Sequence, residues 1–271
     1  MMKGLREIFL ILLMMPFSAR AELSGQAVLN KVYGRYDPEE QCWQATDSDA
    51  QSYCMKLTQS SQVDTGSGHR LYVLATGCTK DGGMNGVPGL VGIFVAEEQE
   101  GKLVITYSNA KIPMGSYGCP PRADWKLVRL GAKDYWGWRT EETLHLGAGS
   151  ATFGAGAIFA PCAGKNICNL TDFVVTYDDT DSGCLGDGDE KQAATVIEST
   201  FDFDRNQSDV GIFPLKITLT GKITGKGFAA KTWTLVFDSK KWTYAQPGDW
   251  PLKDIEDGCL ADYGSLKVLE K

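Results

Sequence analysis

The side chains best suited to chemistry in this chain are eight cysteines and two histidines. The histidines are His69 and His145, and no Cys-x-x-Cys occurs, so the usual ligand spacings of zinc sites are absent. An even number of cysteines in an exported chain is typical of disulfides. Eight cysteines allow 105 pairings, so the sequence does not determine the connectivity. Local closure along the chain favours the pairs Cys42–Cys54, Cys78–Cys119, Cys162–Cys168 and Cys184–Cys259.

Two Asp-Thr/Ser-Gly segments are the sharpest candidates for acid–base catalysis. They begin at Asp64 and Asp181, and they resemble the paired catalytic loops of pepsin-like aspartic proteases, in which two carboxyls share a proton. The resemblance covers these two segments alone, and mostly polar residues precede them where that family has apolar strand residues. Ordinary turn chemistry also explains both segments and is the favoured interpretation. Hydrolysis by Asp64 and Asp181 is therefore an alternative hypothesis.

The acidic segment 178–190 raises the question of a metal ion. Asp179, Asp181, Asp187 and Asp189 are candidate oxygen ligands for calcium, but their spacing is not that of an EF-hand. An exposed loop tied by a disulfide accounts for the same residues. We expect no metal, with calcium as the alternative. No Walker loop and no Gly-x-Gly-x-x-Gly leading into a helix occurs, so we also expect no cofactor.

Four side chains are candidates for binding. Trp136 and Trp138 would share one face of a strand and could stack on a glycan, although burial in the core is the favoured interpretation. Tyr117 lies in a Gly- and Pro-rich segment that would form a rigid, protruding contact loop. Ser67 lies in the segment 65–68, which is similar to the Ser-Gly-Ser-Gly loop of periplasmic C-type lysozyme inhibitors.

Short apolar runs separated by turn residues predict an all-β fold. From residue 53 onward these runs are rich in β-branched and aromatic residues and end at Gly, Pro, Asn or Asp, as in antiparallel strands joined by hairpins. Before them, Ser24 and Gly34 bound an amphipathic segment that predicts a short N-terminal helix. We expect a disulfide-stapled meander of hairpins, arranged as a sandwich, a barrel or a propeller.

The same patterns divide the chain into four segments. Residues 1–21 are predicted to be a signal peptide, and residues 22–52 the helix and a stapled connector. Residues 53–161 form the first β-meander, and residues 162–271 a second β region packed against it as one unit. The boundary between the last two is placed at Pro161 because a polar segment follows it.

The N-terminus predicts export. Lys3 and Arg6 precede an apolar run, and Ala19 and Ala21 are the small residues of a cleavage site. The run is shorter than the roughly 20 residues that a membrane-spanning helix needs, so we expect cleavage near Ala21 and no integral membrane span. The mature protein is then periplasmic or extracellular.

The charge of the chain argues against nucleic acid as a partner. The formal net charge is −7, and removal of residues 1–21 makes it more negative because three of the four charged residues lost are basic. A negative surface repels phosphate backbones. We therefore expect a non-enzymatic binding protein, such as an inhibitor, an immunity-type protein or a cell-envelope ligand binder, with a protein or an envelope glycan as partner. A structural envelope component is a further alternative.

Overall fold

The structure is a computed structural model that describes residues 23–66, 68–80, 87–115, 117–120, 123–145, 151–180, 194–206, 211–252, 255–256, 259–260, 266 and 269. The predicted signal peptide and the candidate residues Ser67, Asp181, Cys184, Asp187 and Asp189 lie outside these ranges. The elements in chain order are α1 (Gly25–Tyr33), β1 (Tyr36–Asp37), β2 (Cys42–Thr46), β3 (Ser52–Thr65), β4 (Gly68–Thr79), β5 (Gly89–Gln99), β6 (Lys102–Met114), β7 (Asp124–Arg129), β8 (Trp136–His145), β9 (Thr152–Pro161), η1 (Ala163–Lys165), β10 (Ile167–Asp178), β11 (Val196–Phe203), β12 (Leu215–Ile223), β13 (Lys226–Asp238), β14 (Thr243–Ala245), β15 (Ile255–Glu256) and β16 (Cys259–Leu260).

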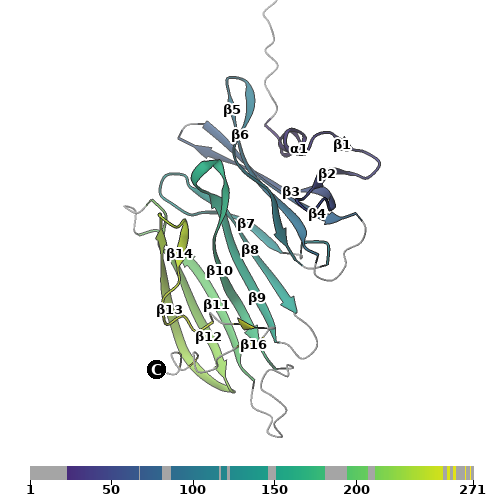
Figure 1. Ribbon diagram of the computed structural model, residues 1–271. Helices are drawn as coiled ribbons and strands as arrows, with labels where there is room; N and C mark the ends of the chain where they lie inside the picture. The colour runs from purple at the N-terminus through teal and green to yellow at the C-terminus, as the bar shows by residue number, and fades with distance from the viewer. Residues whose placement is uncertain are drawn as a thin grey trace, which may run out of the picture.

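The described strands form two large antiparallel sheets, which confirms the predicted all-β class (Figure 1). In the first sheet, six strands follow one another in the order β1 to β6. In the second sheet, eight strands follow one another from β7 to β14. Both sheets are meanders, because each strand pairs with the next one along the chain.

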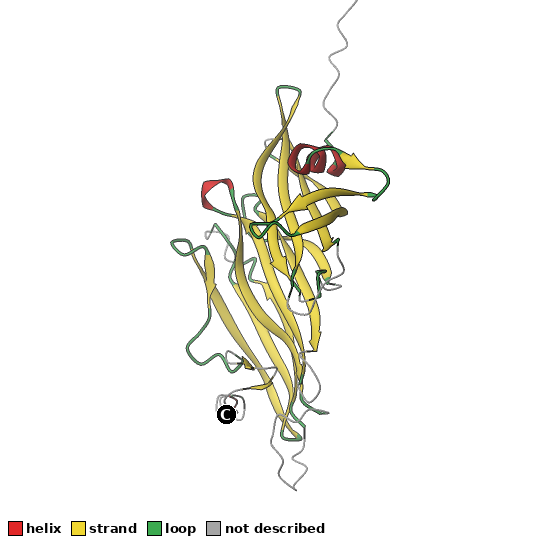
Figure 2. Ribbon diagram, turned by 45° about the vertical axis from the view of Figure 1, so that its right-hand side comes forward, coloured by secondary structure: helices red, strands yellow, loops and turns green. Residues whose placement is uncertain are grey.

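The predicted N-terminal helix is present as α1. Its first turn is capped by Ser24, whose Oγ accepts a hydrogen bond from the amide of Ala27 at 3.2 Å. It ends at Gly34, which has a φ of 89° and donates its N–H to the carbonyl of Asn30. Val28 and Leu29 are buried against the first sheet. The helix thus covers one face of that sheet, as Figure 2 shows.

The alternation of side chains on β4 explains the layers of the molecule. Leu71, Val73 and Ala75 point toward α1 and join its apolar cluster. Tyr72 and Leu74 point the other way and pack in a second cluster with residues of β8 and β9. Successive side chains of a strand face opposite sides of a sheet. The first sheet is therefore sandwiched between α1 and the second sheet.

The far face of the second sheet has its own core. On β9, Ala157 and Phe159 face the first sheet, whereas Ile158 and Ala160 join the largest cluster on the opposite side. Trp250, from the segment after β14, packs edge-on against Trp233 with ring centroids 5.5 Å apart. The described residues after β14 that complete this core are Trp250, Leu252, Leu266 and Leu269.

The change of sheet falls between β6 and β7. Residues 161–169 lie within the second sheet, where Pro161 of β9 pairs with Ile167 of β10. The disulfide Cys162–Cys168 closes this hairpin around η1. A polar segment beginning with Pro resembles a linker in sequence, but here it is a cross-linked turn.

Short strands lie in the segment before residue 52, which was predicted to contain a stapled connector. It contains β1 and β2, which extend the first sheet, with Gln44 paired to Cys54 and the disulfide Cys42–Cys54 joining β2 to β3. The hairpin expected around residues 64–68 is tighter than predicted, because the ladder continues to the pair Thr65 and Gly68. Polar residues on edge strands and hairpin ends hide their strand character, because no core pattern marks them.

None of the helices in the described part of the chain has the length and apolar character needed to cross a bilayer.

Candidate functional site

Loops from three parts of the chain meet at one end of the first sheet. The first comprises residues 47–51 between β2 and β3, and the second the described residues on either side of the connection from β4 to β5. The third comprises residues 115 and 117–120 after β6. The disulfide Cys78–Cys119 joins the end of β4 to the last of these loops. The amide of Thr79 donates to the carbonyl of Gly118 at 2.6 Å, and the amide of Gly118 donates to the carbonyl of Val87 at 2.7 Å.

Tyr117 stands out on this fixed loop because 66% of it is exposed. It forms a parallel β-bridge with Val87, and its neighbour Gly118 has a φ of 71°, a conformation that glycine adopts without strain. A Cβ on Gly89 would overlap Pro120, so the loop backbone lies directly on β5. Tyr117 is therefore an exposed aromatic ring on a rigid support.

A hollow of about 690 Å³ lies next to Val87, the residue that bridges to Tyr117. We call Tyr117 and this neighbouring hollow the Tyr117 surface. Tyr53 and Leu90 are buried and form its inner wall, whereas Ser48, Asp49 and Lys111 are exposed and lie at its mouth. The described residues that line the hollow are Asp47, Ser48, Asp49, Gln51, Tyr53, Val87, Pro88, Leu90, Lys111 and Pro113.

Asp47 organises the wall of the hollow. Its carboxylate accepts hydrogen bonds from the amides of Asp49 (2.9 Å) and Gln51 (3.0 Å) and from the hydroxyl of Tyr53 (2.9 Å). Partial desolvation raises the pKa of Asp47, but these hydrogen bonds and the charge of Lys111 outweigh it and leave the pKa lowered. Burial, followed by the contact with Asp47, raises the pKa of Tyr53 to about 12.

This chemistry suits binding. Near pH 7 Asp47 is ionised and Tyr53 neutral, so the turn that shapes the hollow is fixed by charge-assisted hydrogen bonds. The hollow offers apolar wall residues and charged groups at its mouth, the composition of a ligand-binding depression.

Trp136 and Trp138 lie in the interior. Trp138 is 1% exposed, and Trp136 is partly buried against the cluster between the two sheets. Trp125 packs in the same cluster and stacks at a tilt on Phe159, with ring centroids 5.9 Å apart. The two indoles therefore stabilise the contact between sheets and do not present a paired face for stacking on a sugar.

Asp64 lies near the tip of the β3–β4 hairpin, with its side chain exposed. Its Oδ1 is 2.6 Å from Nδ1 of His69, which is its cross-strand partner. The amide of Gly66 at this tip lies 3.4 Å from Oδ2 of Asp134, just before the start of β8. Asp178, the last residue of β10, pairs with Thr152, which in turn pairs with His145 at the far end of β8. At the rise of a strand, that far end is roughly 30 Å from the start of β8, which lies near Asp64.

Asp179 is the one calcium candidate among the described residues. It is buried, and its carboxylate accepts a hydrogen bond from the amide of Thr195 at 2.6 Å. This bond joins the two ends of the segment that follows β10, which is a structural role. Among the described residues, no three His, Cys, Asp or Glu side chains lie together in a group that could hold a metal ion.

The Tyr117 surface was only partly visible in the sequence. Tyr117 was a candidate because of its Gly- and Pro-rich loop, but Asp47, Tyr53 and Lys111 were not. They come together because β2, β3 and β6 reach the same end of the sheet, and the pairing register that brings them there is not evident from local composition. The Asp47-Ser-Asp turn was the available signal.

Comparisons with protein-family models, with curated proteins and with solved structures find no match for this chain.

Proposed function

We propose that this chain is an exported, non-enzymatic binding protein whose contact site is the Tyr117 surface. The observation that carries the proposal is the exposure of Tyr117 on a loop held by Cys78–Cys119 and by backbone bonds to Val87. Tyrosine is enriched among the residues that dominate binding energy at protein interfaces. A ring held in place before binding loses little conformational entropy when it docks.

The partner that fits this surface best is a protein. An exposed ring next to a hollow of about 690 Å³ gives the surface both a convex and a concave part. A folded partner protein can be complementary in shape to both parts. Asp49 and Lys111 at the mouth of the hollow supply the polar rim of such an interface. An inhibitor, an immunity-type protein and a cell-envelope ligand binder would all use such a surface.

Export is part of the same proposal. The disulfides Cys42–Cys54, Cys78–Cys119 and Cys162–Cys168 fit folding outside the cytoplasm, where thiols are oxidised. The basic and apolar N-terminal residues support a signal peptide cleaved near Ala21, and a periplasmic or extracellular mature chain. The exposed position of Asp64, roughly 30 Å from the end of β10, favours binding over an aspartic hydrolase as the function.

Site-specific photo-crosslinking tests the contact site. A photoreactive phenylalanine analogue is placed at Tyr117 in the mature chain and, as a control, at Val236, which is 58% exposed on β13 of the second sheet. We expect a discrete protein adduct from position 117 in extracts of the native compartment and none from position 236. Tyr117→Ala should weaken capture of that protein by the tagged chain about tenfold, and Val236→Ala should not. Equal adducts at both positions, or capture unchanged by Tyr117→Ala, would refute the proposal.

A further inference from the structure

A second concave site lies between α1 and the β1–β2 hairpin. We call it the helix groove, and its volume is about 490 Å³. Gln26 and Asn30, four residues apart on the exposed face of α1, form one wall. Tyr36 and Gln41 come from the β1–β2 hairpin, which forms the other wall.

An aromatic pair lies in this groove. The rings of Tyr36 and Trp43 meet edge to face, with centroids 4.7 Å apart. Trp43 is buried, and its Nε1 donates to Oδ1 of Asn30 at 2.8 Å, so the indole is fixed in the floor. Tyr36 is 37% exposed and presents part of its ring to solvent. The apolar face of a sugar ring packs on an aromatic ring of this kind.

The polar groups of the groove are mainly carboxamides. Gln26, Asn30 and Gln41 each carry a group that can both donate and accept hydrogen bonds, which is also the property of a sugar hydroxyl. Because Oδ1 of Asn30 accepts from Trp43, its Nδ2 is directed away from the indole. Lys56 is the charged group among the described lining residues, and no carboxylate is among them.

Gln41 adopts a backbone conformation that suits glycine better. Its φ is 54°, in the left-handed region, where a side chain with a Cβ is strained. Backbone strain of this kind concentrates at functional sites, where the side chain is kept for another reason. Here the side chain lines the helix groove.

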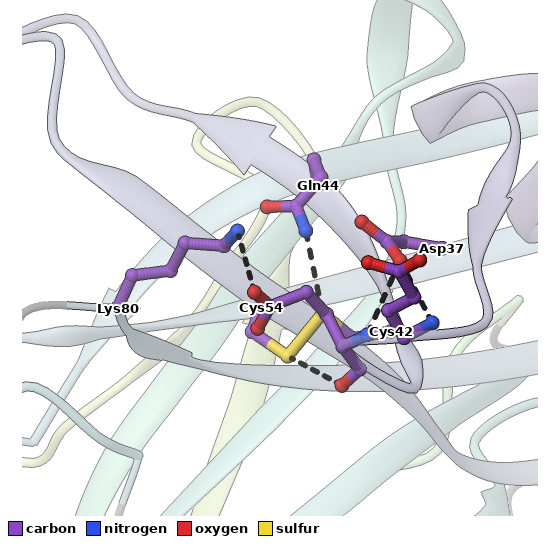
Figure 3. A network of polar contacts seen from close by, with 7 residues as sticks. Asp37, Cys42, Gln44, Cys54 and Lys80 are labelled. Atoms are coloured by element: carbon purple, nitrogen blue, oxygen red, sulfur yellow. Dashed lines mark hydrogen bonds and ion pairs between the residues drawn. A yellow bond between two sulfur atoms is a disulfide. The ribbon is translucent and has the colours of Figure 1, made fainter.

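Both walls are fixed before any ligand arrives. The β1–β2 turn is tied by Asp37, whose Oδ1 accepts from the amides of Glu39 (3.0 Å) and Glu40 (3.1 Å), and by the Cys42–Cys54 disulfide beside it (Figure 3). Lys80 adds an ion pair to Glu40 at 3.8 Å. The opposite wall is fixed because Lys31 and Tyr33 of α1 donate to backbone carbonyls of β6.

We propose that the helix groove binds a neutral sugar ring of an oligosaccharide. The ring packs against Tyr36, and its hydroxyls exchange hydrogen bonds with Gln26, Asn30 and Gln41. The exposed tyrosine ring supplies the apolar contact, and the carboxamides supply orientation without requiring a charge on the ligand. This site and the Tyr117 surface share no lining residue, so the two proposals stand or fall separately.

Binding of two neutral probes tests the inference. Maltotriose and triacetylchitotriose are titrated into the mature chain, with saturation-transfer NMR and calorimetry as readouts; the first lacks acetamido groups and the second carries them. We expect saturable binding of at least one probe with a Kd below about 10 mM. Tyr36→Ala should weaken it about tenfold, and Val236→Ala on the other sheet should leave it unchanged. Binding of neither probe, or binding that survives Tyr36→Ala, would overturn the proposal.

Two variants separate binding from folding. Gln41→Gly relieves the strained φ, so its unfolding midpoint should stay level or rise while affinity for the sugar falls several-fold. Gln26→Ala lies on an exposed helix face, where alanine favours the helix, and it should weaken binding without loss of stability. A purely structural role for these side chains predicts unchanged affinity in both variants, and that result would also contradict the site.

Discussion

The first sheet places the disulfides Cys42–Cys54 and Cys78–Cys119 at its loop-bearing margins, whereas the second sheet uses Cys162–Cys168 to close a hairpin among its inner strands. Beside the first two lie the helix groove and the Tyr117 surface. On the outer strands of the second sheet, threonines such as Thr218 and Thr232 bond to one another across the ladder, as on an ordinary solvated face.

This difference suggests that the second sheet mainly supplies the core and that the first sheet carries the proposed binding sites. The larger sheet holds the largest apolar cluster and supports the smaller one through the cluster between them. The smaller sheet holds the exposed rings of Tyr36 and Tyr117 on backbone that disulfides fix in place. The comparison predicts that changes between the sheets reduce stability, whereas changes at the first sheet's margins reduce binding.

The largest effect is expected from Trp138→Ala. Trp138 is fully buried between the sheets, so its removal leaves a cavity and should lower the free energy of unfolding by about 3–5 kcal/mol. Tyr117→Ala, at an exposed position, should change it by less than about 0.5 kcal/mol. Urea unfolding followed by fluorescence measures both. Similar losses in the two variants would mean that Trp138 and Tyr117 do not differ as core and surface.

The next effect compares the disulfides of the two sheets. Cys78–Cys119 spans 41 residues and Cys162–Cys168 spans 6. In the chain-entropy account, the longer loop is worth about 1–2 kcal/mol more, so the double Cys→Ala variant of the first pair should lose more stability. It should also lose the adduct at Tyr117, because the loop is no longer fixed. Unfolding without reductant, together with crosslinking, gives both readouts, and a larger loss from the 162–168 pair would reverse the comparison.

The general architecture was predictable because it depends on local patterns. Ser24 and Gly34 bounded the helix correctly, and apolar alternation marked the central strands, because burial imposes a period on sequence. Neighbouring cysteines pair at Cys42–Cys54 and Cys162–Cys168 because a meander brings adjacent strands together, and Cys78–Cys119 ties the end of β4 to the loop after β6.

The two proposed sites were largely unpredictable for the opposite reason. Asp47 and Lys111 are 64 positions apart and meet only through strand register, and the groove between α1 and β1 depends on how the helix docks. Trp136 and Trp138 were binding candidates because period-two spacing puts both indoles on one face of a strand, yet that spacing is equally that of a buried face. Local sequence patterns indicate which face of a strand is buried. They do not indicate which surface residues, distant in the sequence, lie next to one another in the folded chain.

A third prediction concerns the fourth pair of cysteines. Cys184 lies outside the described residues, and its pairing with Cys259 stays a prediction. Thiol titration of the unreduced mature chain in denaturant should detect no free sulfhydryl if all eight cysteines are paired. Two free thiols would leave the three observed disulfides in place and would remove the predicted fourth bridge.

The smallest effect is a pH dependence at the margin of the first sheet. The folded state lowers the pKa of Asp47 below its unfolded value, near 4, so the stabilisation it gives is present above that pH and is lost as the pH falls through the folded pKa. The pKa of Tyr53 is raised to about 12, so its contribution is complete below roughly pH 10 and is lost between there and pH 12.

Tyr53→Phe separates the loss of stability at acid pH (the acid limb) from the loss at alkaline pH (the alkaline limb). It removes the hydroxyl that donates to Asp47, so the pKa of Asp47 should rise toward its ordinary value and the acid loss of stability should begin at higher pH. The alkaline loss that belongs to Tyr53 should disappear, because the phenylalanine does not titrate. Chemical denaturation across pH 2–12, with tyrosinate absorbance as a second readout, measures both limbs. If the acid loss of stability began at the same pH in both proteins, the hydrogen bond from Tyr53 would not stabilise the Asp47 carboxylate. The turn at Asp47 that forms the wall of the hollow would then be held less firmly than the loop that carries Tyr117.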